Sequence, residues 1–392
     1  MKKYILFFLL IVFSACNRTK NNTELLDEKG ILIVDVTKKY PKSDAIFIQE
    51  IAEVEYIPLE TNNDFLCHGN GVVAYIDDNI IIFNNKPVRN ILIFDRKGNA
   101  LRRINRQGQG GEEYVAPTDV AFDKESNELY VNDVDKKKIF VYDIIGNYKR
   151  SFEHINGKRY TKIYNFNKEA LLCYDRSAVE FDEQKYPFTI ISKHTGERIK
   201  EVDIPFEKRI SERYIFRDGN NTRIIGMYPI PEPAIELMGN AFVLNEISSD
   251  TIYQISKDYS MTPLIAQTPS VQQMGENPHY LCFIMGANNY QFMFTQKKEF
   301  NPETNTGFPT QALVYDRKKD EIFEQNFYNR DRSGESFDII SGNNNQSIYD
   351  FQPVRLKKYL ENGELSGQLK EIAEKINEDD NPVLMIITFK KQ

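Results

Sequence analysis

Ile91-Leu-Ile-Phe-Asp-Arg-Lys-Gly-Asn99 is the stretch that decides the fold. It is an apolar run ending in a polar turn with Asp95 and Gly98, and a short strand-like segment, 100–105, follows it. Two such runs around a turn containing Asp and Gly are typical of a β-hairpin. The sequence Val141-Tyr-Asp-Ile-Ile-Gly-Asn147 repeats the pattern 48 residues later. A hairpin that recurs at this period indicates a repeat architecture.

Outward from these hairpins, the chain divides into six units of predicted antiparallel strands. The first three read as complete four-stranded units, at residues 71–104, 117–152 and 162–204. The fourth follows a charged segment, and its strands are expected at 223–228, 241–246, 251–256 and 261–267. The fifth is expected at 280–285, 290–296, 312–316 and 322–328. Repeated four-stranded units of this size predict a β-propeller.

The sixth unit is incomplete within its own stretch of sequence. Its expected strands are 337–341, 347–351 and the nearly all-apolar 383–389, with a helical pattern over 354–376 between them. The early segment 51–59 alternates apolar and acidic residues as a half-buried strand does, and its Pro58 favours an outer edge. Pairing 51–59 with 383–389 would complete the sixth unit and cover an exposed strand edge. We therefore expect an all-β, six-bladed propeller over residues 31–392, with a short helical insertion in the last blade.

The amino terminus has the layout of a secretory signal. Met1-Lys2-Lys3 is basic, residues 4–13 are apolar, and Phe-Ser-Ala precedes Cys16. The apolar run is shorter than the ~20 residues that span a bilayer. A Cys in this position resembles the lipobox of bacterial lipoproteins, which implies a signal peptide at 1–15, lipidation of Cys16 and a tether at 16–30. The alternative is plain secretion with a chance Cys near the cleavage point.

Lipidation of Cys16 implies a membrane partner. Several acyl chains on one Cys anchor a protein stably, whereas one chain alone does so only marginally. We expect an outer-membrane lipoprotein. The residues after the Cys, Asn17-Arg-Thr-Lys20, are basic or neutral, whereas surface-exported lipoproteins of related type tend to carry acidic residues there. This favours the periplasmic face over the cell surface.

Charge and cysteine content limit the other partners. The chain has 50 basic and 57 acidic residues and a formal charge of −7, which becomes −9 without the predicted signal peptide. Its longest basic run is 136–138, so no nucleic-acid partner is expected, and we expect a monomer. The remaining cysteines, Cys67, Cys173 and Cys282, are odd in number and match no Cys-x-x-Cys metal spacing. We interpret them as small buried apolar residues.

A glycine-rich segment lies between the two hairpins. It reads Arg106-Gln-Gly-Gln-Gly-Gly-Glu-Glu-Tyr114 and is followed by Pro117 and a strand. A phosphate loop would be followed by a helix, so a phosphate site is not expected. Together with Val54-Glu-Tyr-Ile-Pro-Leu-Glu-Thr61 and Asn381-Pro-Val-Leu384, the segment resembles NHL-type repeats and the family of six-bladed β-propeller lipoproteins. This chain has Gly111 where that family usually has Pro. The resemblance implies the fold and an envelope location, and it carries over no catalytic residues.

The inner strands of a propeller and the loops leading into them usually line its ligand site. On that geometry, the candidate ligand-binding residues are polar groups of the glycine-rich loop and the second unit: Arg106, Gln107, Glu113, Tyr114, Asp119 and Asp133. Such a set can grip a sugar or a peptide. The structural alternative, which we favour, is that Asp119 and Asp133 accept hydrogen bonds from turn amides and that Arg106 pairs with Glu113.

The sequence therefore predicts a lipid-anchored binding or assembly module of the bacterial cell envelope, whose partner is a glycan, a peptide or a protein. The alternative is a hydrolase or lyase of the lactonase or NHL-lyase kind that uses a channel metal such as Ca²⁺. The four His residues, at 68, 154, 194 and 279, are scattered, and the sequence has no Gly-x-Ser-x-Gly elbow. We assign no catalytic residue, no metal ligand and no cofactor beyond a possible Ca²⁺ in the channel, and an enzyme is the less favoured hypothesis.

Overall fold

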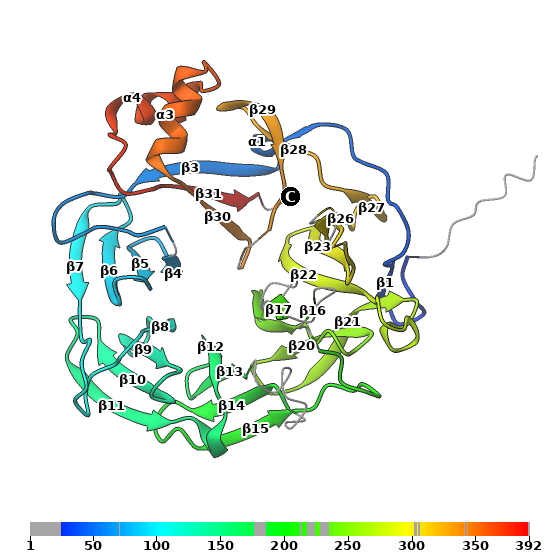
Figure 1. Ribbon diagram of the computed structural model, residues 1–392, viewed down its shortest axis with the longest axis horizontal. Coiled ribbons are helices and arrows are strands. Elements are labelled where there is room, and N and C mark those ends of the chain that lie inside the picture. The colour runs from blue at the N-terminus through cyan, green and yellow to red at the C-terminus, as the bar shows by residue number, and fades with distance from the viewer. Residues whose placement is uncertain are drawn as a thin grey trace, which may run out of the picture.

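The computed structural model describes residues 25–69, 71–175, 186–211, 214–217, 224–227, 235–301, 304, 306–340, 342 and 344–390, without the side chains of 214–236. These residues form a β-propeller, in which sheets follow one another around a ring with their innermost strands toward the centre (Figure 1). The predicted signal peptide and Cys16 lie outside the described residues.

The first three blades are the four-stranded antiparallel sheets that the hairpin repeats predict. Their strands are β4 (Val72–Ile76), β5 (Ile80–Asn85), β6 (Asn90–Asp95) and β7 (Ala100–Ile104); β8 (Asp119–Asp123), β9 (Glu128–Asp133), β10 (Lys138–Asp143) and β11 (Tyr148–Glu153); and β12 (Tyr160–Asn165), β13 (Ala170–Asp175), β14 (Phe188–Ser192) and β15 (Arg198–Val202). A short 3₁₀ helix, Ile155–Gly157, joins the second blade to the third. In each blade the first strand lies nearest the centre (Figure 1).

The fourth and fifth blades differ in part from the prediction. The fourth comprises β18 (Ile235–Met238), β19 (Ala241–Leu244), β20 (Thr251–Ser256) and β21 (Met261–Thr268), and β1 (Leu32–Asp35) adds a parallel fifth strand at its outer edge. The fifth, after the 3₁₀ helix Val271–Gln273, comprises β22 (His279–Ala287), β23 (Tyr290–Lys297), β26 (Thr310–Asp316) and β27 (Glu321–Glu324).

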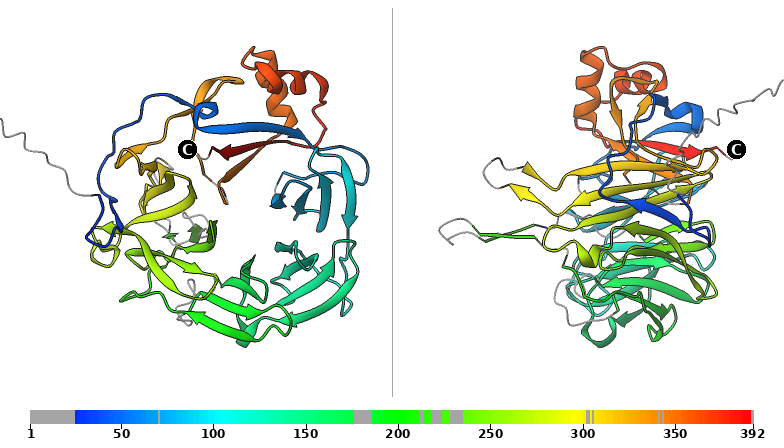
Figure 2. Two further views of the ribbon diagram at one scale, coloured as in Figure 1. Left: turned by 180° about the vertical axis from the view of Figure 1, so that it is seen from behind. Right: turned by 90° about the vertical axis from the view of Figure 1, so that its right-hand side faces the viewer.

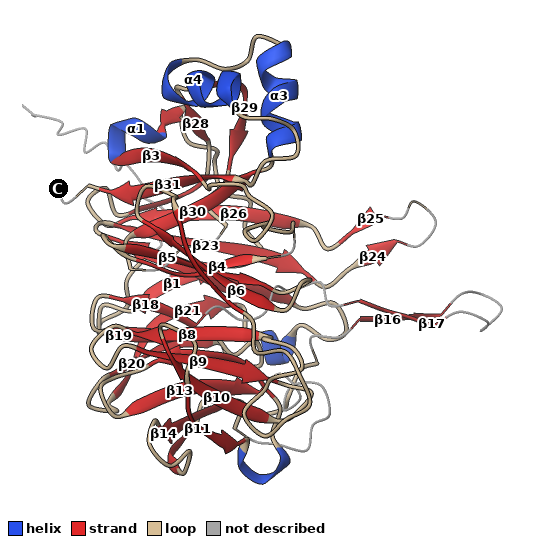
Figure 3. Cartoon of the chain, turned by 90° about the vertical axis from the view of Figure 1, so that its left-hand side faces the viewer, coloured by secondary structure: helices blue, strands red, loops and turns tan. Residues whose placement is uncertain are grey.

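Two hairpins project together from one face of the ring (Figures 2 and 3). One pairs β16 (Tyr214–Arg217) with β17 (Ile224–Met227), and the other pairs β24 (Phe300–Asn301) with β25 (Thr306–Gly307). The prediction that 223–228 is the first strand of the fourth blade is therefore wrong. This segment pairs with β16 in a separate hairpin, and β18 takes the predicted place.

The ring closes where the two ends of the propeller sequence meet. In the closing blade, β3 (Ala52–Pro58) pairs antiparallel with β31 (Val383–Phe389), and β31 pairs with β30 (Gln346–Phe351). Val54 lies opposite Ile387, and Pro58 lies opposite Val383 at the outer edge of the sheet. This is the pairing of 51–59 with 383–389 proposed from the sequence. The apolar residues of β31 between Val383 and Ile387 are at most 2% exposed, because alternate side chains pack into hydrophobic clusters on the two faces of the sheet.

The predicted number of six blades is wrong, because seven sheets of three or more strands are present in the described ranges. The additional, small blade consists of β2 (Ile46–Phe47), β28 (Phe327–Asn329) and β29 (Arg332–Phe337). The predicted strand 322–328 is interrupted at Gln325 and Asn326, so that its end belongs to this sheet. The first strand expected in the sixth unit, 337–341, is likewise replaced by β29, which ends at Phe337.

The helical insertion lies beside the small blade and the closing blade (Figure 1). It consists of two helices rather than one continuous pattern, α3 (Pro353–Glu361) and α4 (Gly367–Lys375). The break contains Gly363 with φ +71°, a conformation that residues with a Cβ rarely adopt. Leu356 and Leu369 are fully buried, in a cluster with Tyr56 of β3. The short helix α1 (Ile48–Ile51) leads into β3.

The glycines of the repeated hairpin turns have two structural roles. Gly98, Gly146 and Gly196 all have positive φ. A Cβ on Gly146 would lie 3.2 Å from Ile104 Cγ2, and one on Gly196 would lie 2.4 Å from Phe152 Cβ. Ile104 and Phe152 belong to the outer strands of the preceding blades. The glycine therefore serves both the turn conformation and the close packing of one blade on the next.

Buried asparagines tie successive blades together. The side-chain amide of Asn84 donates to Pro117 O (3.0 Å), and that of Asn132 donates to Tyr160 O (2.7 Å). Asn245 makes two bonds to the fifth blade, accepting from Phe283 N at 2.7 Å and donating to Leu281 O at 3.4 Å. The three side chains come from the second strand of a blade or the residue just after it, and they are at most 2% exposed. Each bond joins the backbone leading into, or forming, the innermost strand of the next blade.

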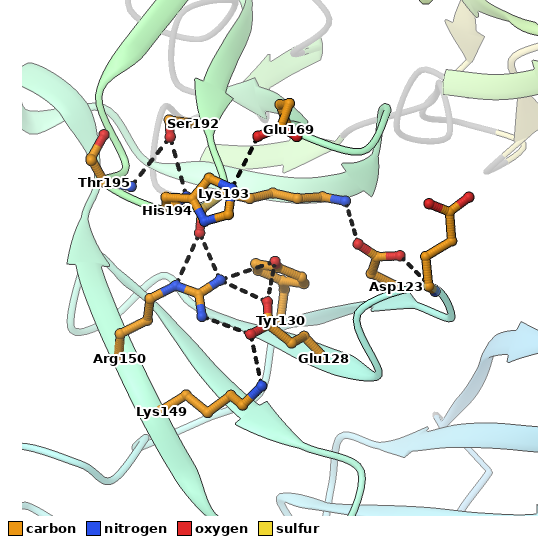
Figure 4. A network of polar contacts seen from close by, with 11 residues as sticks. Asp123, Glu128, Tyr130, Lys149, Arg150, Glu169, Ser192, Lys193, His194 and Thr195 are labelled. Carbon is orange, nitrogen blue, oxygen red and sulfur yellow. Dashed lines mark hydrogen bonds and ion pairs between the residues drawn. The ribbon is translucent and has the colours of Figure 1, made fainter.

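The interface between the second and third blades also contains a network of charged groups (Figure 4). Arg150 donates to both carboxylate oxygens of Glu128, at 2.8 and 2.7 Å, and to the backbone oxygen of Lys193. Lys193 in turn forms an ion pair with Asp123 at 2.7 Å, with side chains only 2% and 6% exposed. Because a buried charge is costly without a partner, these groups hold the two blades in one relative position.

We expect deletion of residues 51–60 to lower the melting temperature by more than about 10 °C. The deletion leaves β31 with a free edge and exposes apolar residues of the closing blade. A thermal unfolding scan measures this change. Glu53→Ala, at an exposed position of β3, is the matched control and leaves the melting temperature nearly unchanged. An unaltered melting curve for the deletion would show that the ring is closed by other contacts.

A second prediction concerns pH. Burial lowers the pKa of His154 from 6.5 to about 4. Its Nε2 lies 2.9 Å from Asn132 Oδ1 and therefore donates, while Nδ1 lies 3.2 Å from Tyr160 N and accepts. Below pH 6.5 the unfolded chain binds a proton that the folded chain does not, so stability falls as the pH drops to about 4, by on the order of 3 kcal/mol.

Denaturant unfolding at pH 7 and pH 4.5 measures this contribution. His154→Gln is expected to be less stable than the parent at pH 7 but to lose less stability on acidification. His194→Gln is the control for replacing a histidine by glutamine at an exposed position, because the His194 side chain is 66% exposed. Equal acid sensitivity of the parent and His154→Gln would contradict the assignment.

Candidate functional site

A cavity of about 910 Å³ lies at the centre of the ring. Three of the innermost strands, β4, β8 and β12, form one part of its wall, and β30 forms another, with Leu384 and Thr388 of β31 behind it. Leu237 and Phe242 of the fourth blade complete the lining together with Gly342 and Asn344. A cavity of this size is in the range of small-molecule and peptide sites.

One part of the wall is a polar group at the end of β4. The Tyr75 hydroxyl donates to Asp77 Oδ2 at 3.1 Å, and Lys124 Nζ lies 2.7 Å from the same oxygen. Asp77 Oδ1 also accepts from the backbone amides of Asn79 and Ile80. Burial by itself would raise the pKa of Asp77, but the hydrogen bonds from Lys124 and the two amides outweigh it and lower this pKa to about 2. Asp77 is therefore a carboxylate throughout the physiological range, and its charge is already paired.

A second polar group joins β8 to β12. Asp119 Oδ2 accepts from Ile163 N at 2.9 Å, and Asp119 Oδ1 lies 3.4 Å from Lys162 Nζ. The Asp119 side chain is 12% exposed and the Lys162 side chain 25% exposed. The carboxylate thus aligns two innermost strands, and the lysine is the more accessible partner at the cavity wall.

Aromatic rings separate these polar groups. Tyr75 meets Phe122 edge to face, with centroids 5.0 Å apart, and Tyr164 meets Phe242 in the same manner at 6.3 Å. Asn165 donates to Phe122 O at 3.3 Å. Each contact crosses from one blade to the next, so the rings give the wall rigid, partly exposed apolar surface.

The side of the cavity formed by the closing blade is less crowded. Gln346 donates to Thr388 Oγ1 at 3.0 Å, and Asp350 accepts from Gln352 at 2.7 Å. Asp350 is exposed, as is Asp78 after β4. The carboxylates of the lining are Asp77, Asp78, Asp119 and Asp350, and its one lysine is Lys162. The cavity therefore favours neutral polar or cationic ligands over anions.

Most of the residues predicted from the sequence do not line this cavity. Arg106, Gln107, Glu113 and Tyr114 belong to the loop after β7, the outermost strand of its blade. Arg106 donates to Gly146 O at 2.7 Å, and Glu113 accepts from Gly110 N at 2.8 Å, so the expected pair between Arg106 and Glu113 is replaced by bonds to the backbone. Tyr114 is fully buried. Of the six candidates, the cavity lining includes Asp119.

Asp133 follows the structural alternative, whereas Asp119 accepts from a strand amide of the next blade rather than from a turn amide. Asp133 is fully buried, and its carboxylate accepts from the amides of Val115, Ala116, Asp135 and Lys136. Asp119 accepts from the Ile163 amide, as described above. Asp133 thus holds the loop that leads into its own blade. The glycine-rich loop itself is absent from the cavity lining.

The lining residues that sequence reasoning missed are Tyr75, Asp77, Lys162 and Asp350. They are polar residues of, or just after, strands that adjoin the channel. Single strands of four to six residues do not show which polar positions face the channel rather than a neighbouring blade.

The described residues contain no group of three or more His, Cys, Asp or Glu side chains placed to hold a metal ion. Cys67 is partly buried, Cys173 and Cys282 are buried, and all three are free thiols. No helix in the described part of the chain is long and apolar enough to cross a membrane.

These features define a β-propeller with a ligand-sized central cavity. A family model described as a domain of unknown function, DUF4934, matches residues 31–388. The chain belongs to the DUF4934 family. No curated protein matches the sequence significantly.

Solved structures share the fold at low identity. A Bacteroides fragilis protein described as exported is 15% identical, with a TM-score of 0.64, and the match covers 92% of this chain and all of that one. A member of the DUF4221 family from Bacteroides vulgatus is 12% identical over 87% of this chain and 97% of that one, with a TM-score of 0.48. A virginiamycin B lyase from Staphylococcus aureus is also 12% identical, covering 86% of this chain and all of that one, with a TM-score of 0.37. At 15% identity, the similarity to the Bacteroides fragilis structure shows a shared fold and nothing about function.

Proposed function

We propose that this protein is a lipid-anchored binding module of the bacterial cell envelope and that its ligand occupies the central cavity. The observation that carries the proposal is the cavity itself, with about 910 Å³ of space and a wall that combines buried and partly buried aromatic rings with polar side chains. Such a mixture of apolar surface and a few oriented polar groups is typical of ligand sites. Within the lining, Asp77, Asp119 and Gln346 are already held by hydrogen bonds, so the wall is preorganised.

The envelope location rests on the amino-terminal sequence. Cys16 directly follows a short apolar run and Phe-Ser-Ala, as the modified Cys of a lipoprotein does. The Bacteroides fragilis structure described as that of an exported protein has the same fold, which is compatible with an envelope role for this chain. We propose the periplasmic face of the outer membrane as its location, because Arg18 and Lys20 follow the Cys.

A thermal-shift screen of the mature chain against glycans, peptides and divalent cations tests the binding function. A ligand at 100 times its dissociation constant adds about 2.7 kcal/mol to the free energy of unfolding. Ala74→Trp, which fills part of the cavity, is expected to abolish the shift, and Glu371→Ala, at an exposed position of α4, to preserve it. A shift that survives Ala74→Trp in a folded variant would place the ligand elsewhere.

Fractionation of cells tests the anchor. We expect the full chain to sediment with the outer membrane and Cys16→Ser to be recovered in soluble fractions, because the acyl chains attach to the thiol. Protease added to intact cells should leave the parent protein undigested if it faces the periplasm. Membrane association of Cys16→Ser equal to that of the parent would contradict the lipid anchor, and rapid digestion in intact cells would contradict the periplasmic face.

A further inference from the structure

Charge is distributed unevenly along the central cavity, whose innermost strands β8 and β12 run in the same direction. Ile163 N donates to Asp119 Oδ2 at the start of β8. Two residues further along β12, Asn165 donates to Phe122 O, which lies further along β8 as well. Lys162, the lysine of the cavity lining, has its Nζ 3.4 Å from Asp119 Oδ1. Its positive charge is therefore at the end of the cavity where β8 begins.

The other end of the cavity is acidic. The ring of Tyr75 meets that of Phe122, which is three residues, or about 10 Å, beyond the first residue of β8. Asp77 and Asp78 directly follow the end of β4. They share Lys124, because its Nζ lies 2.7 Å from Asp77 Oδ2, and the hydrogen bond with Asp77 and the charge of Asp78 both raise the pKa of this lysine. Two carboxylates against one lysine leave this end with a net negative charge.

The neighbouring closing blade adds a further carboxylate beside an apolar surface. Ile76 of β4 and Ile348 of β30 both line the cavity and pack against the same hydrophobic cluster. Asp78 and Asp350 each follow one of these isoleucines by two positions, and both carboxylates are exposed members of the lining. The hydrogen bond that Asp350 accepts comes from Gln352, a neutral amide. Two blades thus each present one exposed carboxylate and one apolar side chain to the same space.

These groups call for a ligand that donates hydrogen bonds and carries positive charge. An ionised carboxylate only accepts hydrogen bonds, whereas an ammonium group has three donors and no acceptor. A neutral sugar would leave the carboxylate charges unpaired, and an anion would be repelled. The partly buried rings of Tyr75 and Tyr164 belong to the same lining. Aromatic rings attract ammonium groups and also pack against methylene groups.

We propose that the ligand is a linear aliphatic polyamine, which binds in the cavity with its ammonium groups on Asp78 and Asp350. This inference rests on the proposed binding function and names its ligand class. Charge-assisted hydrogen bonds to the two carboxylates supply affinity. The methylene groups between the amines contact Ile76 and Ile348, and the Tyr75 ring offers a cation–π contact. The formal charge of the whole chain, −7, also favours association with a cation.

Calorimetric titration of the mature chain with spermidine tests this class. Salt at about 0.15 M screens long-range attraction between exposed charges, so that general counterion binding is suppressed. Two comparison compounds separate the contributions. Triacetylspermidine keeps the methylene chain but has no charge, and Mg²⁺ has two positive charges but no methylene groups. We expect spermidine to bind at least tenfold more tightly than either of them.

Protein variants test the two carboxylates. Asp78→Asn combined with Asp350→Asn is expected to weaken spermidine binding at least tenfold. The matched control is Glu361→Gln combined with Glu371→Gln, two exposed carboxylates on α3 and α4, and it should leave binding unchanged. Both double variants carry the same change in net charge. Equal weakening in both would therefore show a general electrostatic effect and would overturn the assignment to Asp78 and Asp350.

The remaining outcomes separate this inference from the proposed function. Binding of spermidine no tighter than that of Mg²⁺ or of triacetylspermidine would overturn the polyamine class. A glycan or peptide whose thermal shift is abolished by Ala74→Trp, together with no binding of spermidine, would overturn the polyamine class and retain the cavity as a binding site. If neither spermidine nor any compound of the screen bound in a manner sensitive to Ala74→Trp, the proposed function itself would be contradicted.

Discussion

The structure depends on buried side-chain hydrogen bonds that cross from one blade to the next. Asn84, Asn132 and Asn245 are almost completely buried, and each bonds to the backbone of the following blade. Within the assembled ring, removing one of these amides would leave a buried backbone group of the next blade without its partner, at a cost of roughly 1–3 kcal/mol. These bonds therefore fix each blade relative to the next, and with it the shape of the central cavity.

In the first two blades, the residue directly after the asparagine binds the loop that leads into its own blade. Asn85 accepts from His68 N and donates to Leu66 O, and Asp133 accepts from Val115 N and Ala116 N. Two adjacent polar residues at the end of a second strand thus perform two separate tasks. One fixes the next blade and the other fixes the entry to its own. Asp133 was a candidate ligand group from sequence, and its burial within this arrangement explains why an Asp is required there without any ligand.

The amino-terminal segment joins neighbouring blades at the outer edge of the ring, as the buried asparagines join them in the interior. β1 pairs with β21, Glu324 N donates to Pro41 O, and β2 pairs with β28 before β3 reaches β31. One stretch of about 30 residues therefore covers the outer edges of four sheets in succession. Edges left open in this way are sites of unwanted association.

The local sequence alone determined the elements whose signals are contained in a few residues. The hairpin turns at Asp95 and Asp143, the strands of the first three blades, and the role of Pro58 at an edge all follow from turn chemistry and alternation. The pairing of β31 with β3 could also be predicted from the sequence. The last unit lacked a strand, and the early segment 51–59 was a strand with no unit of its own. The NHL-like resemblance pointed to the propeller fold, which the structure shows, although with seven sheets rather than six.

Tertiary structure decided what depends on residues far apart in the sequence. The segment 223–228 was expected in the fourth blade, but in the structure β18 takes that position and β17 pairs with β16. The break at Gln325 arises because its side chain bonds to Ile339, fourteen positions away, and the end of the predicted strand then pairs with β2. The cavity is likewise a product of assembly. Tyr75, Lys162 and Asp350 belong to three blades, and only closure of the ring brings their side chains around one space.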